Sequence, residues 1–485
     1  MKRNKILHIT PHLGGGVGRV LLNYFKETKN NESLLHEIAC LDDANRQAIE
    51  TAEDVGLLLT DRLAGESRRL MTMVSRADIV IIHWWNHPLL FEFLVRTSLP
   101  PCRLVLWSHI SGFHPPYVFT EKIFRYPDLF VFTTPISYET EEAKNCPDEI
   151  KMRVIWSTGG VEHVRSIQHT ANDEFTVGYI GTVDYAKLHP EFLALCNAID
   201  IHKIRFIVCG GPSEKCIQNE AERFGLNKKM IFTGLVSDIR GYLSMFDIFG
   251  YPLAPYHYGT CDQSLAESMA AGVVPVVFAN RMEKSMVRNG VTGIVAKDKK
   301  DYVDAVRALW SDSRLRAFLS NNAKEYALNT FTLEKMVKEW DMIFDEALSF
   351  PKKRRKWELY TPVEKISAAD IFLESLGEQG KPFWDYCHAG NEKEKEHALE
   401  KIVELGNVPL WQAETRGTVH HYYRFFSNDP VLEKLSRSMK GAQCTSLFTG
   451  PLSEKQNLIS HLRLRRDRGS GSRRARRGST GQAPA

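Results

Sequence analysis

The fold is decided by one stretch, Gly259 to Val277, with the sequence GTCDQSLAESMAAGVVPVV. Its pattern predicts a loop, a short helix and a buried strand. Asp262 or Ser264 can cap the helix, because a short side-chain oxygen accepts a bond from a free backbone N–H. Gly272 can adopt the left-handed conformation that ends it. The apolar run VVPVV then predicts a strand, in which Pro275 favours an edge position or a bulge.

Glu267 has two explanations within this stretch. Ser264 and Glu267 are spaced as in a capping box, where the glutamate only satisfies backbone donors. Alternatively, Glu267 binds a ligand at a helix N-terminus, where free N–H groups and a partial positive charge attract anions. A second glycine-to-helix junction, GGGVGR at residues 14–19, has the same property. Together the two junctions indicate a cleft between two halves that holds a diphosphate.

Length and composition indicate a multidomain protein without membrane-spanning helices. The chain has 485 residues, a length that indicates about three domains. Its residues are 43% hydrophobic and 25% charged, which is typical of a globular protein. We find no apolar run of 18 residues, and the N-terminus lacks the pattern of a secretory signal. Nine cysteines without a Cys-x-x-Cys pair argue against a disulfide framework or a structural zinc site. We therefore expect a cytoplasmic protein.

The basicity of the chain is concentrated at its end. Residues 460–485 contain eight arginines and one aspartate, a local charge of +7. Subtracting this from the net charge of +4 leaves −3 for the remainder, so the main body is nearly neutral. The end also lacks aromatic residues, and its composition predicts a disordered tail.

The first part of the chain predicts an alternating α/β domain. A glycine-rich turn follows the first strand and leads into a helix, as in nucleotide-binding domains, although the glycine spacing is not that of the dinucleotide fingerprint. Interior strands are predicted at residues 5–10, 78–83, 103–107, 129–134 and 153–157. Loops at the carboxyl ends of such strands usually carry ligand-binding residues.

Two of these loops are rich in histidine. The first carries His83 and His87, and the second carries His109 and His114 together with small polar residues. Histidines can bind metal ions, but no carboxylate or cysteine accompanies these histidines at ligand spacing. Ordinary loop residues are the alternative, and we predict no metal.

The second part of the chain repeats this architecture. A polar linker at residues 163–173 precedes strands predicted at 175–180, 204–209, 230–233 and 247–251 and the stretch that opened this section. An amphipathic helix at 332–348 is expected to close this domain. A basic junction, KKRRK at 352–356, leads into a mainly helical region, 363–440. Its aromatic segment 419–432 is best explained by packing onto the main body.

These patterns define four regions. A first Rossmann-like domain spans residues 1–165, and a second Rossmann-like domain spans 166–350. An accessory helical region occupies 351–458, and the arginine-rich tail occupies 459–485.

A series of motifs carries a resemblance to a known family. They are GGGVGR, WSHISG, GYIGT followed by Lys187, VCGGP, IFTGLV, DIFGYPL, SLAESMAAGVVPVV and VRNGVTGIVAKD, within residues 5–348. In this order and spacing they resemble the retaining glycosyltransferases of family 4. The resemblance implies a GT-B fold, in which two Rossmann-like domains face a cleft, and a sugar-nucleotide donor held mainly by the second domain.

The resemblance also implies roles for particular residues. Glu267 matches the glutamate that bonds the ribose hydroxyls, and Lys187 matches a phosphate-binding lysine. His109 matches the histidine near the reacting sugar; these three are the predicted catalytic residues. The donor is further expected to contact Gly15, Gly16, Thr182, Gly234, Asp262, Gln263, Ser264 and Leu265, with the base near residues 232–235.

The residue types suit departure of a nucleoside diphosphate. A lysine and helix-end N–H groups stabilise charge on the leaving phosphate without a metal or other cofactor. The family's mechanism is usually described as front-face attack that retains the anomeric configuration. Two positions depart from its pattern: Gly259 replaces the first of two motif glutamates, and Thr182 replaces an arginine.

Several functions follow from these expectations. The first is a retaining, metal-independent transferase that uses a UDP- or GDP-sugar and a glycan or lipid-linked acceptor, in polysaccharide, lipopolysaccharide or glycolipid synthesis. The second, kept open by Gly259 and Thr182, is a weakened sugar-nucleotide-binding subunit of a partner transferase. The third is a sugar-nucleotide epimerase of similar architecture, whose acidic and histidine residues are not evident at a clear spacing.

The basic tail and KKRRK suggest contact with anionic lipid. The alternative is a solvated tail with incidental, unspecific nucleic-acid affinity.

Overall fold

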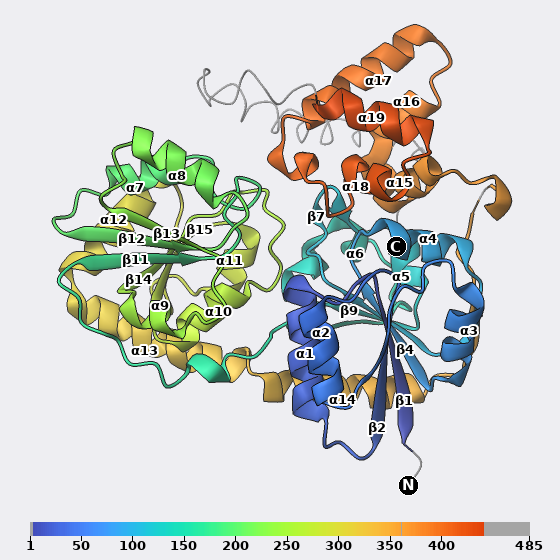
Figure 1. Ribbon diagram of the computed structural model, residues 1–485, viewed down its shortest axis with the longest axis horizontal. Helices are drawn as coiled ribbons and strands as arrows, with labels where there is room; N and C mark the ends of the chain where they lie inside the picture. The colour runs from blue at the N-terminus through green and yellow to red at the C-terminus, as the bar shows by residue number, and fades with distance from the viewer. Residues whose placement is uncertain (1–2, 360, 441–485) are drawn as a thin grey trace, which may run out of the picture. The chain divides into compact units, whose positions relative to one another are not determined.

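The computed structural model describes residues 3–359 and 361–440; the predicted disordered tail lies outside these residues. Two parallel sheets, each covered by helices, form two α/β halves (Figure 1). We call them the first half and the second half. This architecture confirms the predicted doubly wound domains.

The first half is built on a seven-stranded parallel sheet with the order β10-β9-β6-β4-β1-β2-β3. Its strands are β1 (Asn4–Thr10), β2 (Leu34–Cys40), β3 (Leu58–Thr60), β4 (Ile79–Trp84), β6 (Leu104–Ser108), β9 (Leu129–Phe132) and β10 (Met152–Val154). Its helices are α1 (Gly15–Thr28), α2 (Arg46–Asp54), α3 (Ser67–Arg76), α4 (Pro88–Arg96), α5 (Glu121–Arg125) and α6 (Glu141–Lys144). The central strands are fully buried apolar runs, as parallel strands covered on both faces must be.

The second half has a six-stranded parallel sheet with the order β13-β12-β11-β14-β15-β16. Its strands are β11 (Phe175–Ile180), β12 (Ile204–Cys209), β13 (Met230–Gly234), β14 (Ile248–Tyr251), β15 (Val274–Phe278) and β16 (Ile294–Ala296). Its helices are α7 (Phe192–Ala198), α8 (Glu214–Arg223), α9 (Arg240–Met245), α10 (Gln263–Ala270), α11 (Arg281–Met286), α12 (Lys299–Ser311) and α13 (Ser313–Thr330).

The opening stretch folds as predicted in outline and differs in one detail. Helix α10 ends at Ala270, and Gly272 just beyond it has the expected positive φ of 82°. However, strand β15 lies between β14 and β16, so the expected edge position of Pro275 is wrong. The ladder to β16 begins only at Val276, so the missing N–H of Pro275 lies outside that ladder.

Helix α14 (Leu333–Leu348) forms as predicted but packs elsewhere than expected. Its buried side chains, among them Trp340 and Phe344, belong to the core of the first half together with Ile6 and Trp107. Figure 1 shows α14 beside α1, and the two helices are in contact. The helix therefore closes the first half rather than the second, because its apolar face matches the exposed apolar side of the first sheet.

The accessory region is mainly helical, as predicted, and shares a core with the first half. It contains α15 (Ala368–Leu376), α16 (Lys381–Cys387), α17 (Glu392–Leu405), α18 (Val419–Phe425) and α19 (Pro430–Lys440). Tyr422 of the aromatic segment is fully buried in a cluster that includes Trp84 and Phe91. The interpretation of this segment as a packing surface is confirmed.

Short elements complete the described chain. They are the paired strands β5 (Leu99–Cys102) with β17 (Lys353–Arg355) and β7 (Phe113–His114) with β8 (Tyr117–Val118), and 3-10 turns at Pro135–Glu139, Glu162–Val164, Val363–Lys365, Gly377–Gly380 and Pro409–Gln412. In the part of the chain that the structure covers, none of the helices combines the length and apolar character that a membrane span requires. The eight cysteines within it are free.

Candidate functional site

Glu267 lies on α10 and faces the first half. Its side chain is 2% exposed, and its Oε1 accepts from Arg19 Nη2 at 2.6 Å and from Gln263 Nε2 at 3.1 Å. His163 Nε2 lies 3.2 Å from the same oxygen. Three donors thus fix Oε1, whereas none of these contacts uses Oε2. The geometry suits a carboxylate held in position to accept hydrogen bonds from a ligand.

The helix-cap explanation of Glu267 is wrong. The N-cap of α10 is Asp262, and neither it nor Ser264 makes a side-chain cap bond. Asp262 turns instead to Lys187, and Ser264 bonds the hydroxyl of Tyr251. The N-terminal N–H groups of α10 are therefore not consumed by a capping side chain.

Gln263 ties α10 to the turn that joins the two halves. Its Oε1 accepts from the N–H of Gly159 at 2.7 Å, and its Nε2 donates to the carbonyl of Gly160 at 2.7 Å. Asn23 of α1 donates to the Gly159 carbonyl at 2.6 Å. The side chain of Gln263 is thus engaged in the fold. Leu265 is fully buried, so only the backbone at that predicted contact can meet a ligand.

Lys187 and Asp262 form a buried ion pair. Lys187 Nζ lies 3.0 Å from Asp262 Oδ1, and the two side chains are 10% and 6% exposed. Burial lowers the pKa of Lys187, but Asp262 acting together with the neighbouring tyrosines Tyr251, Tyr179 and Tyr258 holds the pKa well above its usual value. Among the described residues, Asp262 Oδ2 has no hydrogen-bond partner. An incoming diphosphate must therefore compete with Asp262 for Lys187.

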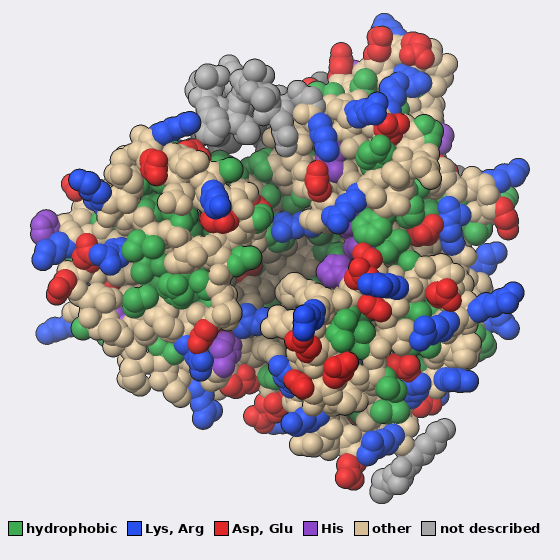
Figure 2. All heavy atoms as spheres, viewed as in Figure 1, with side chains coloured by type: hydrophobic (Ala, Val, Ile, Leu, Met, Phe, Trp, Pro, Cys, Tyr) green, Lys and Arg blue, Asp and Glu red, His purple; other side chains and the backbone are tan. Residues whose placement is uncertain are grey.

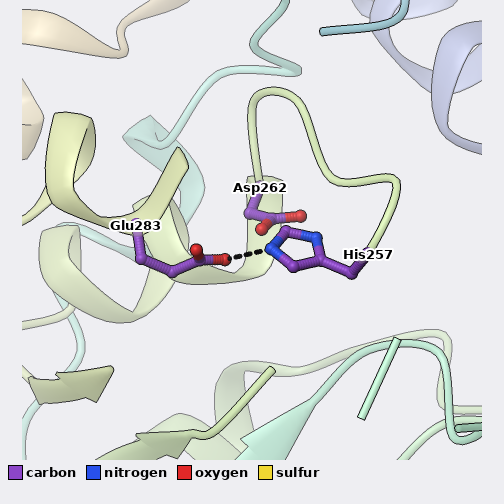
Figure 3. Close-up of side chains that lie close together, drawn as sticks. All are labelled: His257, Asp262 and Glu283. Atoms are coloured by element: carbon purple, nitrogen blue, oxygen red, sulfur yellow. Dashed lines mark ion pairs between the residues drawn. The ribbon is translucent and has the colours of Figure 1, made fainter. Parts of the chain in front are cut away.

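Gly259 lies beside a second buried pair, His257 and Glu283 (Figure 3). His257 Nε2 is 2.9 Å from Glu283 Oε1, and Asp262 lies next to the same ring. A Cβ at Gly259 would lie 2.7 Å from His257 Nδ1 and 2.9 Å from Asp262 Oδ2. These side chains fill the space that a side chain at position 259 would need.

His257, Asp262 and Glu283 lie close enough together to resemble metal ligands, but their hydrogen bonds do not fit one. His257 Nδ1 accepts the N–H of Gly259 at 2.9 Å, so the ring proton must reside on Nε2. That nitrogen, which lies 2.9 Å from Glu283 Oε1, then has no lone pair for a metal. The cluster is a group of buried charged and polar side chains.

Four histidines of the first half form a continuous chain of imidazoles: three lie on neighbouring strands, and His109 directly follows β6. His109 Nε2 contacts His83 Nδ1 at 3.1 Å, His83 Nε2 contacts His8 Nδ1 at 2.9 Å, and His8 Nε2 contacts His36 Nδ1 at 3.0 Å. Burial lowers the pKa of His83 to about 3 and that of His36 to about 4. Neutral rings joined in this order must share one tautomer, because each link needs one N–H and one lone pair. His109 is thus positioned by the chain.

The glycines that were predicted to contact the donor have open space beside their backbone. Gly15 and Gly16 are exposed and begin α1 itself, rather than lying in a loop before it. A Cβ at Gly15, Gly16 or Gly234 would meet no atom within 4 Å. Beside Gly234, Leu235 is 87% exposed, which leaves an apolar surface where the base is expected.

Two arginines at the site were not predicted. Arg19 bonds Glu267 across 248 residues of sequence, although the motif GGGVGR contained it. Arg416 of the accessory region places its guanidinium carbon 3.4 Å from the ring centroid of Tyr258. The hydroxyl of Tyr258 in turn donates to Thr182 Oγ1 at 2.8 Å. No sequence motif indicated Arg416.

Comparison with solved structures establishes the class of fold. HepE from Anabaena in complex with UDP has a TM-score of 0.58 at 15% identity over 70% of this chain and 100% of that chain. A glycosyltransferase from Rickettsia africae has a TM-score of 0.60 at 14% identity over 72% and 100%. Sucrose-phosphate synthase from Thermosynechococcus elongatus has a TM-score of 0.53 at 15% identity over 71% and 99%. The predicted GT-B fold is confirmed.

Sequence comparison finds a family match that covers most of the second half. Residues 161–326 match the family model of glycosyl transferases group 1. This segment contains Thr182, Lys187, Asp262 and Glu267. No curated protein matches the sequence of the chain.

Proposed function

We propose that the chain is a glycosyltransferase that moves a sugar from a UDP- or GDP-sugar to a glycan or lipid-linked acceptor. The observation that carries the proposal is Glu267: a buried carboxylate, oriented by Arg19 and His163, within the segment that matches group 1 transferases. Its unused oxygen can accept bonds from the two hydroxyls of a ribose.

The proposed reaction retains the anomeric configuration. The bond between the anomeric carbon and the phosphate oxygen breaks, and its electron pair stays on the diphosphate. The acceptor oxygen bonds to the same face of the sugar and passes its proton to the leaving phosphate. Lys187 and the free N–H groups of α1 and α10 stabilise the growing negative charge without a metal.

His109 is proposed to hydrogen-bond a hydroxyl of the transferred sugar. Its Nδ1 has no partner among the described residues, and its pKa is well below the usual value because of burial and the neighbouring His83. A neutral imidazole can donate to or accept from a hydroxyl, according to its tautomer. We therefore assign His109 to sugar positioning rather than to charge stabilisation.

Binding of nucleotides to the purified full chain tests the proposal. Isothermal titration with UDP, GDP and their sugars is the first measurement, and UDP is the first choice because the similar HepE structures hold UDP and UDP-glucose. Glu267→Gln should weaken binding about tenfold to a hundredfold, since bonds to a charged group contribute roughly 1.5–3 kcal/mol. Glu339→Gln, on α14, is the matched control. Equal binding by wild type and Glu267→Gln would overturn the site.

A second candidate function is a nucleotide-sugar-binding subunit with weak or no turnover. Two observations favour it: Lys187 is already neutralised by Asp262, and His257 and Asp262 fill the space beside Gly259. Transfer of radiolabelled sugar to a panel of glycan and lipid-linked acceptors separates the two candidates. Tight donor binding without transfer or donor hydrolysis would favour the subunit.

We also propose a cytoplasmic location with peripheral contact to anionic membrane. The arginine-rich tail carries most of this proposal, because part of KKRRK is engaged in the fold: Arg355 pairs with Asp128, and Lys352 donates to the carbonyl of Ala77. On the face seen in Figure 2, basic and acidic side chains are interspersed. Vesicles containing anionic lipid should bind the full chain and lose binding when residues 460–485 are deleted. Unchanged binding after the deletion would contradict the proposal.

A further inference from the structure

The loop before α18 holds Arg416 in an unusual conformation. Arg416 has a φ of 74° and the following Gly417 a φ of 77°, both in the left-handed region. For a residue other than glycine, the left-handed conformation is unfavourable by on the order of 1 kcal/mol of free energy. It persists only where the surrounding structure enforces it. Such positions concentrate at functional sites, which directs attention to what Arg416 contacts.

The loop is fixed by a tight contact with the first half. A Cβ at Gly417 would lie 2.4 Å from Asn86 Cγ, so only glycine fits there. Asn86 is fully buried and bonds the Pro116 carbonyl at 3.1 Å and the hydroxyl of Tyr422 at 2.9 Å. The backbone of Arg416 is therefore anchored, and its side chain starts from a defined position.

The guanidinium of Arg416 lies where two halves and the accessory region meet. It stacks on Tyr258 of the second half, and Tyr117 of the first half and Asp184 lie close enough to act on its charge. Tyr258 bonds Thr182, the position at which the family pattern carries a phosphate-binding arginine. Asp184 is a charged neighbour of Arg416, whereas Lys187 is directly paired with Asp262.

We propose that Arg416 binds the diphosphate of the donor, so that the accessory region completes the donor site. The inference rests on the proposed function. A guanidinium stacked on a tyrosine still presents several N–H groups along its edges, and two of these can match two phosphate oxygens at once. The cation absent at Thr182 is thus supplied from a residue far along the chain, and the accessory region has a role beyond packing.

Titration of the full chain with UDP and with uridine tests this inference. Arg416→Gln keeps a planar group over Tyr258 but removes the charge, and should weaken UDP binding about tenfold to a hundredfold while leaving uridine binding unchanged. Arg416→Lys should lose less, because the charge remains without the two-pronged geometry. Arg437→Ala, an exposed arginine of α19 paired with Glu433, is the control and should bind UDP like wild type.

Restoring the cation at the original position sharpens the test. In the Arg416→Gln background, Thr182→Arg should recover at least tenfold of the lost UDP affinity. The thermal midpoint of each variant shows that it folds; if Arg416→Gln does not, Arg416→Lys alone decides. UDP binding unaffected by either Arg416 variant, or equal loss of uridine and UDP, overturns the inference. If wild type binds no nucleotide at all, the proposed function itself fails.

Discussion

The two halves place opposite chemistry at the carboxyl ends of their strands. In the first half, His8, His83 and His109 are buried, neutral and bonded to one another. In the second half, Lys187 and Asp262 are buried as an ion pair beside a second buried ion pair, His257 and Glu283. The same α/β architecture thus carries a neutral hydrogen-bonding surface on one side and fixed charges on the other.

This difference matches the two ends of a sugar nucleotide. A sugar and its acceptor are neutral and offer hydroxyls, which neutral imidazoles can both donate to and accept from. A leaving diphosphate is anionic and needs cations that are already in place. Under the proposed function, we therefore expect the first half to recognise the sugar and the second half to recognise the phosphates, with Arg416 added from the accessory region.

The largest expected effect comes from breaking the buried ion pair between Lys187 and Asp262 in the second half. Lys187→Met leaves Asp262 buried without a partner and should lower the free energy of unfolding by about 3–5 kcal/mol. Asp262→Asn leaves Lys187 equally unpaired. Urea unfolding of both single variants and the double variant measures the coupling. The double variant should lose clearly less than the two single losses added together; simple additivity would show that the pair is not coupled.

Acidification should lower the stability of the protein through the buried neutral histidines of the first half. The folded-state pKa of His36 is about 4 and that of His83 about 3, both below the usual 6.5, because of burial. Their contribution to stability is complete above pH 6.5 and is lost as the pH falls toward these values. Between pH 7 and pH 5 each ring should cost about 2 kcal/mol of unfolding free energy.

Urea titrations at the two pH values check this loss. His36→Phe should remove its share of the pH dependence, while His397→Gln, an exposed histidine of α17, should not. A wild-type protein equally stable at pH 7 and pH 5 would show that the rings are protonated at little cost.

A glutamate restored at position 259 should not repair the family motif. Its Cβ meets His257 and Asp262, so Gly259→Glu should destabilise the fold by about 1–3 kcal/mol and should not raise sugar transfer. Gly259→Ala should show most of the same loss. Gly241→Ala, where a Cβ meets nothing within 4 Å, should be neutral or slightly stabilising. Increased transfer by Gly259→Glu would mean that this network rearranges readily.

The smallest expected effect is a spectroscopic one and concerns the tautomers of the four buried histidines. Nitrogen NMR of histidine-labelled protein should show His8, His36, His83 and His109 in one common tautomer at pH 7, as the direction of their links requires. His36→Phe should leave the remaining rings neutral. A mixture of tautomers among the four rings would contradict the chain.

Local patterns predicted much of the fold. Buried apolar runs marked β1, β4, β6, β9, β11 and β12, and the helix stop at Gly272 followed from its freedom to adopt a positive φ. Strand β2 was missed because His36 and Glu37 interrupt its apolar run. The placement of α14 was wrong because an amphipathic helix shows which face it buries but not which sheet that face meets.

The site depended on information that no local pattern holds. Glu267, Lys187 and Asp262 were identified from motifs, but the bond from Arg19 to Glu267 needs the two halves to be brought together. The imidazole chain needs the order β6-β4-β1-β2, which brings together three histidines on β4, β1 and β2 and His109 at the end of β6. Arg416 was unpredictable because its role comes from the position of an accessory loop, not from its neighbours in sequence.

The packing of α14 onto the first half has a consequence for synthesis on the ribosome. The chain emerges from its N-terminus, yet the first half needs Trp340 and Phe344 to cover its sheet. Residues 175–330, which supply most of the second half's own core, are complete before these arrive. The half that begins first therefore finishes last, and a chain stopped after residue 330 would leave an apolar sheet face bare for chaperones to cover.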